Sequence, residues 1–176
     1  MLCAVGICFA SGVPVEKILE YASKLTPING RLELISKNIY IDYAHTPDAL
    51  KNALQSLRKH TADKLFVVFG CGGERDHDKR KLMGAAAQQL ADEVIVTDDN
   101  PRGEDPAEIR KMILEGCPNA AEIPDRVSAI KIAISKLKST DILLVAGKGH
   151  EDYQILASGK VPFSDREVIR KVIGLK

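Results

Sequence analysis

Three short apolar runs constrain the fold of this chain more than any other feature of its sequence. They span residues 64–69, 94–97 and 141–146, and valine, leucine, isoleucine and phenylalanine dominate them. Such runs are typical of strands that are buried on both faces of a parallel sheet. Apolar residues at helical spacing fill the intervals, as in 78–90 and 125–137. Strands that alternate with helices predict an α/β fold, with a mostly parallel sheet covered on both faces and right-handed crossovers.

The flanking segments extend this pattern. Residues 32–42 are expected to form a strand hairpin, and residues 154–163 a second one that adds an antiparallel edge to the sheet. Apolar residues recur at helical spacing through 15–25, and Pro27 is expected to break that helix. Helices are predicted to start after capping residues at Thr46, Asp105, Asp125 and Ser164.

Length and charge exclude several classes of protein. The 176 residues suit one domain with a small additional piece, and the net charge of +1 gives no basis for binding nucleic acid or an anionic membrane. No apolar stretch is long enough to span a bilayer, and the apolar start lacks the basic leader of a signal peptide. The four cysteines show neither zinc-type spacing nor a disulfide framework, so reduced thiols in the cytoplasm are expected.

Polar or glycine-rich loops follow the predicted strands. The most informative is Asp98-Asp99-Asn100-Pro101-Arg102, which begins where the strand 94–97 ends. Ligands of open α/β sheets bind beyond the carboxyl ends of the strands. Pro101 stiffens this loop, so that an amide, a guanidinium and carboxylates are presented together. That set of groups suits a small zwitterion with carboxylate and ammonium groups.

Four of these loops, taken in order, resemble the C-terminal domain of the Mur ligases. They are residues 43–48, 70–76, 98–102 and 147–153. The resemblance covers the chain from about Gly30 to its end, and it is greatest to the members that add meso-diaminopimelate. It implies a Rossmann-like three-layer α/β domain of the Mur ligase C-terminal type, whose mostly parallel sheet has an antiparallel edge. It divides the chain into 1–28, a remnant of the preceding ATP-binding central domain with its linker, and 29–176, the amino-acid-binding domain.

The resemblance also implies a reaction, its substrates and its location. Family members are cytoplasmic ligases that use ATP and Mg²⁺ to join an amino acid to a nucleotide-linked peptide, here UDP-MurNAc-L-Ala-D-Glu. The chain has no Gly-x-x-x-x-Gly-Lys-Ser/Thr loop, because Gly149 stands where the hydroxyl residue of such a loop would follow Lys148. ATP and Mg²⁺ are therefore expected to be held mainly by the central domain, and this chain alone is expected to be inactive.

The family motifs assign roles residue by residue. In this sequence the residues matching those that hold diaminopimelate are Arg75, Asp99, Asn100, Pro101, Arg102, Gly147 and Glu151. Arg75 and Arg102 would bind the distal carboxylate and Glu151 the distal ammonium. The residues matching those that approach the nucleotide are Arg31, Asp42 and His45. No metal ligands and no catalytic residue are assigned to this chain.

Several alternatives stay open. A lysine-adding relative, or a stand-alone amino-acid or nucleotide-binding module without catalysis, would carry similar loops. Cys71 could be a nucleophile or a small buried thiol, and its glycine neighbours could cradle a phosphate or support Arg75 flexibly. Lys148 could position a phosphate or amine, or be an ordinary surface lysine. His45 could be a turn residue, and Asp42 an acid at a strand end.

Overall fold

The computed structural model describes residues 2–22, 24–25 and 28–175, and the break predicted at Pro27 lies outside them. The helices are α1 (Leu2–Ala10), α2 (Val15–Ala22), α3 (Pro47–Arg58), α4 (Asp78–Leu90), α5 (Pro106–Leu114), α6 (Arg126–Lys136) and α7 (Asp165–Val172). The strands are β1 (Glu33–Ser36), β2 (Ile39–Asp42), β3 (Leu65–Phe69), β4 (Glu93–Val96), β5 (Ala121–Glu122), β6 (Ile142–Ala146), β7 (Tyr153–Leu156) and β8 (Gly159–Pro162).

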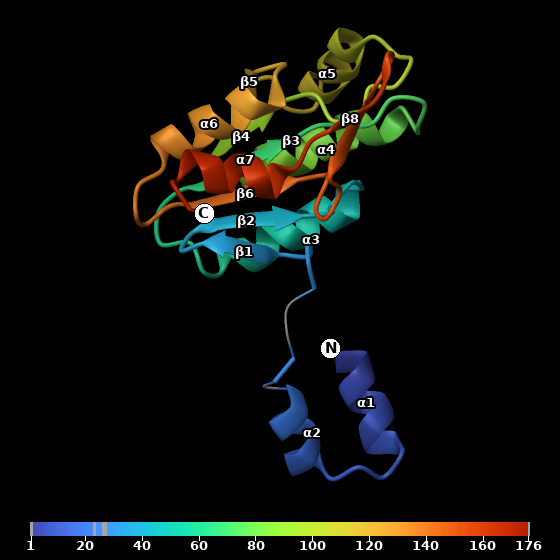
Figure 1. The fold of residues 1–176 in the computed structure, drawn as a ribbon, viewed down its shortest axis with the longest axis vertical. Helices are drawn as coiled ribbons and strands as arrows, with labels where there is room; N and C mark the ends of the chain where they lie inside the picture. Colours follow the sequence, from blue (N-terminus) through green and yellow to red (C-terminus); the bar gives the residue numbers. More distant parts are fainter. Residues whose placement is uncertain (1, 23, 26–27, 176) are drawn as a thin grey trace.

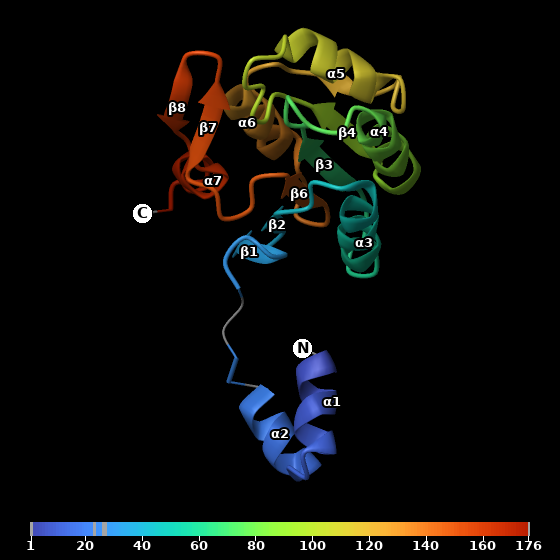
Figure 2. The same ribbon diagram turned by 90° about the vertical axis from the view of Figure 1, so that its right-hand side faces the viewer.

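The predicted α/β architecture is confirmed. The main sheet has the order β1-β2-β6-β3-β4-β5, in which β1 pairs antiparallel with β2 and the other neighbours are parallel. Val68 at its centre lies opposite Ile95 on β4 and Val145 on β6. Helices α3, α4 and α5 cover one face, and α6 and α7 cover the other (Figures 1 and 2).

Side chains of the central strands alternate between two apolar cores, as the pleat requires. Val67 and Phe69 of β3 pack toward α3 and α4, with Leu54 and Met83. Phe66 and Val68 pack toward α6 and α7, with Ile130 and Ile169. Because each central strand is buried on both sides, its sequence shows no polar alternation.

The second hairpin forms as predicted, but its predicted place at the edge of the main sheet was wrong. Strands β7 and β8 form a separate two-stranded sheet, and β1 supplies the antiparallel edge of the main sheet. The backbone of Ile155 in β7 accepts a hydrogen bond from the Arg102 N–H (3.0 Å) and donates one to Asn100 Oδ1 (3.0 Å). These bonds hold the hairpin against the loop after β4 rather than against a sheet edge.

The amino-terminal region has more structure than the sequence predicted. Helix α2 agrees with the predicted helix, but α1 was not predicted, because its residues are apolar without a helical stripe. The two helices lie against each other and stand apart from the sheet (Figure 1). None of the helices in the described ranges has the length and apolar character that a bilayer crossing requires.

A buried ion pair joins the second helical layer to the sheet. Arg126 and Asp165 have fully buried side chains and make two hydrogen bonds of 2.8 Å to each other. Arg126 also donates to the carbonyl of Ala146 at the end of β6 (2.9 Å). The pair thus ties the start of α6 and the start of α7 to the carboxyl end of the sheet.

Substituting Asp165→Asn should lower the free energy of unfolding by about 3–5 kcal/mol, because the Arg126 charge would remain buried without its partner. Urea titration followed by circular dichroism measures the change. Glu167→Gln, on the exposed face of α7, provides a matched control that should stay within about 0.5 kcal/mol of the wild type. Similar unfolding midpoints for the two variants would contradict this role of the pair.

Two of the cysteines belong to the apolar core. Cys71, after β3, is 4% exposed and lies 3.6 Å from the sulfur of Met83, and Cys117 is fully buried. Burial raises the pKa of the Cys71 thiol to about 12 and that of Cys117 to about 11. The prediction of a small buried thiol at Cys71 is therefore confirmed, and a nucleophilic thiolate there is not supported.

Thiol labelling tests this division at pH 8. Cys3 and Cys8 are exposed and should react with a soluble disulfide reagent at once. A thiol with a pKa near 12 is ionised in only about one molecule in 10,000 at that pH, so Cys71 should react only after unfolding. Cys117 should behave in the same way. Rapid labelling of Cys71 in the folded protein would contradict its assignment to the core.

Candidate functional site

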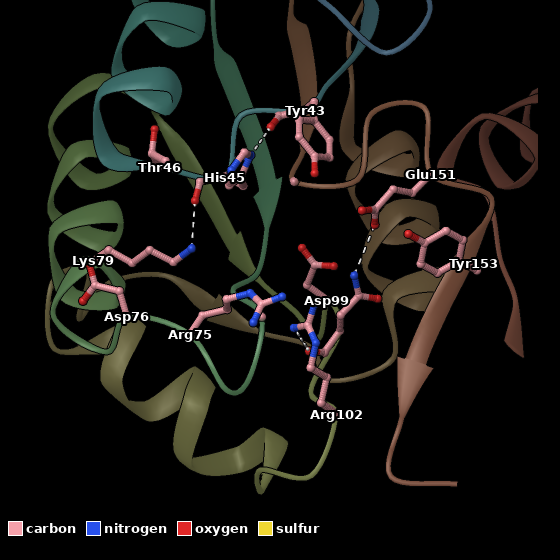
Figure 3. A pocket seen from close by; sticks show the side chains of 13 residues that line it. Tyr43, His45, Thr46, Arg75, Asp76, Lys79, Asp99, Arg102, Glu151 and Tyr153 are labelled. Atoms are coloured by element: carbon pink, nitrogen blue, oxygen red, sulfur yellow. Dashed lines mark hydrogen bonds between the residues drawn. The ribbon is translucent and has the colours of Figure 1, made fainter. Parts of the chain in front are cut away.

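The loops after β2, β3, β4 and β6 enclose a cavity of about 550 Å³ at the carboxyl end of the sheet. Its lining comes from separate parts of the chain and carries both signs of charge (Figure 3). The lining residues are Tyr43, His45, Thr46, Gly72, Arg75, Asp76, Lys79, Asp99, Asn100, Arg102, Gly147, Glu151 and Tyr153. The position agrees with the general place of ligands in open α/β sheets.

Most of the predicted amino-acid site is brought together here. Arg75, Asp99, Asn100, Arg102, Gly147 and Glu151 all line the cavity. Pro101 is buried behind the lining. Sequence reasoning missed Tyr43, Thr46, Asp76, Lys79 and Tyr153 as lining residues. Tyr43, Thr46, Asp76 and Tyr153 lie inside the four loops that carry the family resemblance, so their place in those loops was a usable signal.

The glycine loop packs tightly against the loop after β4. The Gly73 N–H donates to the carbonyl of Asn100 (2.9 Å), and a Cβ at Gly73 would lie 1.9 Å from the carbonyl oxygen of Pro101. A Cβ at Gly70 would lie 2.2 Å from the carbonyl oxygen of Thr97. Glycine is needed here for close approach, which explains these glycines without flexibility; a flexible support for Arg75 stays a prediction. The phosphate cradle loses support, because the Gly73 N–H is already engaged.

Glu74 and Glu104 hold the loops after β3 and β4 together. Glu104 accepts a hydrogen bond from the Glu74 N–H and pairs with Arg80, whose side chain is fully buried, at 2.8 Å. Glu74 in turn accepts from the Gly103 N–H at 3.2 Å. Burial works against the charge of Glu104, but the Glu74 N–H and Arg80 outweigh it and hold its pKa below the usual value. These contacts hold in place the backbone of the two loops that carry Arg75 and Arg102.

The two arginines differ in how firmly they are held. Arg102 has a backbone φ of +55°, and its Nη1 donates to the carbonyls of Gly73 (2.8 Å) and Asn100 (3.2 Å). Arg75 is exposed, and its Nη1 donates to the carbonyl of Glu74 (3.0 Å). Arg102 therefore presents a guanidinium in a fixed plane, whereas Arg75 lies at the mouth of the cavity.

On the opposite side of the cavity, several polar groups surround the ammonium of Lys148. Its ammonium donates to Asn100 Oδ1 (2.8 Å) and to the carbonyl of Tyr153 (2.9 Å). It lies 3.2 Å from Asp99 Oδ1 and 3.8 Å from Glu151 Oε2. Lys148 is fully buried, so the surface-lysine alternative was wrong, and burial lowers its pKa. Its place two residues after a continuous apolar strand was the signal in the sequence.

Glu151 and Gly147 complete this side. Glu151 Oε2 accepts a hydrogen bond from Asn100 Nδ2 (3.2 Å), which is drawn as a dashed line in Figure 3. Gly147 has φ +113°, and a Cβ there would lie 2.8 Å from Asp99 Oδ2. Glycine is thus required by its conformation and by the nearby carboxylate of Asp99.

The three residues predicted to approach a nucleotide are not all in the cavity. His45 lines it, and its Nδ1 is 2.8 Å from the carbonyl oxygen of Tyr43. Arg31 is exposed, with its guanidinium over the Tyr43 ring at 4.5 Å. Asp42 accepts a hydrogen bond from the Leu32 N–H (2.6 Å) at the junction with the amino-terminal segment. Arg31 and His45 thus flank one aromatic ring, and Asp42 ties down the adjacent backbone.

Known proteins can now be compared with this geometry. Residues 30–149 match the family described as "Mur ligase, glutamate ligase domain". UDP-N-acetylmuramoyl-L-alanyl-D-glutamate–2,6-diaminopimelate ligases of Chelativorans sp. and Rickettsia felis are 51% and 52% identical over 98% and 94% of the chain. A solved structure of an enzyme with this name has a TM-score of 0.79 at 38% identity, over 98% of the chain.

The chain spans only part of these longer proteins: 37% and 32% of the two ligases and 37% of the solved structure. The family match nevertheless covers most of the chain, and includes the loops after β2, β3, β4 and part of the loop after β6. The chain belongs to the Mur ligase family.

Proposed function

We propose that the chain is the amino-acid-binding, C-terminal domain of an ATP-dependent ligase that adds meso-diaminopimelate to UDP-MurNAc-L-Ala-D-Glu in peptidoglycan synthesis. The observation that carries this proposal is the convergence of Arg75 and Arg102 with Asp99 and Glu151 around one cavity. An amino acid with a carboxylate and an ammonium at its far end would pair with both signs of charge. The names of these two relatives support this choice of substrates.

The cavity suggests how such a ligand would lie. The guanidiniums of Arg75 and Arg102 would bind the distal carboxylate, and Glu151 would pair with the distal ammonium. Asn100 also lines the cavity, and its Nδ2, which contacts Glu151, would donate a further hydrogen bond to the ligand. The other end of the ligand would then extend outward with its amine free to form the new amide bond. Fixing that amine in place is the main contribution of this chain to the reaction.

Two groups of this chain that could hold a phosphate already have partners within the protein. The Gly73 N–H is occupied by Asn100, and the Lys148 ammonium is enclosed by Asp99 and Glu151. We therefore assign ATP and Mg²⁺ mainly to a central domain, with residues 1–28 as its last part and linker and 29–176 as the amino-acid-binding domain. Arg31, Asp42 and His45 would face the nucleotide when the two domains close, in the cytoplasm.

Calorimetry with meso-diaminopimelate and L-lysine tests the ligand. The chain should bind meso-diaminopimelate at least about tenfold more tightly than L-lysine, because lysine has no distal carboxylate to pair with Arg75 and Arg102. Arg102→Ala should abolish this preference, whereas Arg170→Ala, on the exposed side of α7, should keep it. Equal or tighter binding of lysine by the unmodified chain would contradict the assignment in favour of a lysine-adding relative.

A kinetic experiment in the full-length ligase tests the role of Arg102. Arg102→Ala should raise the KM for meso-diaminopimelate about 10- to 100-fold, because a charge-assisted hydrogen bond is lost. The KM for ATP should change by less than about twofold, since ATP is assigned to another domain. Unchanged amino-acid kinetics would remove Arg102 from the site, and a complete absence of amide-bond formation by the unmodified protein would favour the stand-alone binding module.

A further inference from the structure

Lys148 is an unusual lysine for a cavity wall. Its side chain is fully buried, although lysine is rarely found in that state without a specific partner. It does not line the cavity, so it would not touch a ligand directly. Its ammonium instead reaches Asp99, Asn100 and Glu151, each of which does line the cavity. An ammonium with this set of neighbours acts on a ligand through those three side chains.

The Asn100 carboxamide shows this most directly. Its Oδ1 accepts hydrogen bonds from Lys148 Nζ (2.8 Å) and from the Ile155 N–H (3.0 Å), so both lone pairs are engaged. The Nδ2 is therefore directed away from these donors and lies 3.2 Å from Glu151 Oε2. Lys148 also bonds the Tyr153 carbonyl, close to Ile155 in β7. The lysine thus holds both the amide and the strand that helps to orient it.

The two acids need a countercharge. Asp99 is 6% exposed and Glu151 is half-buried, and both approach the same ammonium. Two carboxylates that share a site favour uptake of a proton by one of them unless a cation is present. Arg126 also interacts electrostatically with both acids, but its own ion pair is with Asp165. Arg102 bonds backbone carbonyls. Lys148 is the cation nearest to both acids among the described ion pairs.

We propose that Lys148 is the positioning residue of the amino-acid site, whose buried ammonium fixes Asn100 and offsets the negative charges of Asp99 and Glu151, so that both can receive a ligand ammonium. The proposal rests on the proposed function for the nature of the ligand. Its electrostatic part concerns this chain alone and can be measured without a ligand.

The test compares Lys148→Met with the unmodified chain between pH 5 and pH 8. Methionine has a similar length but no charge, so one of the two acids should take up a proton in the folded variant. A proton bound more tightly in the folded state stabilises it at low pH, and this stabilisation disappears as the pH rises. The difference in Tm between the variant and the wild type should therefore be smallest at pH 5 and increase toward pH 8. A purely structural loss would give a difference that does not change with pH.

Two further variants make the result specific. Asp99→Asn/Lys148→Met removes an acid together with its cation, so its Tm deficit should lose most of its pH dependence. This double variant also provides a folded reference if Lys148→Met alone does not fold. Lys51→Met, on the exposed face of α3, is the matched control and should follow the wild type at every pH. Other charged or titratable groups surround Lys148, Asp99 and Glu151 and remain in all variants. They are Arg75, Asp76, Lys79, Arg102, Arg126, Asp165 and His45.

Binding of meso-diaminopimelate gives the second readout. Lys148→Met should bind about 10- to 100-fold more weakly than the wild type at pH 6, and the ratio of the two dissociation constants should fall toward pH 8 as the acid ionises. If the wild type does not bind this ligand, the proposed function fails, and the pH dependence of Tm still decides the role of Lys148. A Tm deficit independent of pH, or equal in the single and double variants, would overturn the proposal.

Discussion

The geometry of the cavity depends on burying one ammonium group, that of Lys148, where the loops after β4 and β6 meet. An unpaired charge in this place would be costly, so its neighbours must provide hydrogen bonds and negative charge. Asp99, Asn100 and the Tyr153 carbonyl do so within 3.2 Å. These groups come from different parts of the chain, and their shared contacts with the Lys148 ammonium bring them together. The requirement of a buried charge thus becomes a constraint on the shape of a binding site.

On the other side of the cavity, close packing of the backbone has the same effect. Gly73 lies so near Pro101 that no side chain fits between them, and Glu74 and Glu104 each bond the neighbouring loop. Arg102 then takes a left-handed backbone conformation and directs its Nη1 to two carbonyls. The guanidinium is held before any ligand arrives, so little of its conformational freedom remains to be lost on binding. Arg75, at the rim, keeps more of that freedom.

The sequence predicted those features that depend on neighbours along the chain. The bounds of α4, the capping of α3 by Thr46 and the hairpin of β1 and β2 follow from local spacing and side-chain chemistry. The carboxyl ends of the strands also located the cavity, because parallel strands bring their following loops to one edge. What the sequence did not predict depends on residues far apart. The place of the β7–β8 hairpin is set by Asn100 and Arg102, and the burial of Lys148 is set by the same loop.

These distant contacts also explain why the arginines of the cavity do not pair with its acids. Lys148 lies behind the wall and is matched to Asp99 and Glu151, whereas Arg102 is directed to backbone carbonyls on the other side. Had the arginines been free to reach the acids, the strongest partner of each group would have been another residue of the protein. Because the arginines and the acids have different partners within the protein, their remaining hydrogen-bonding capacity is directed into the cavity. The proposed zwitterionic ligand would then bind by pairing with groups that the fold keeps apart.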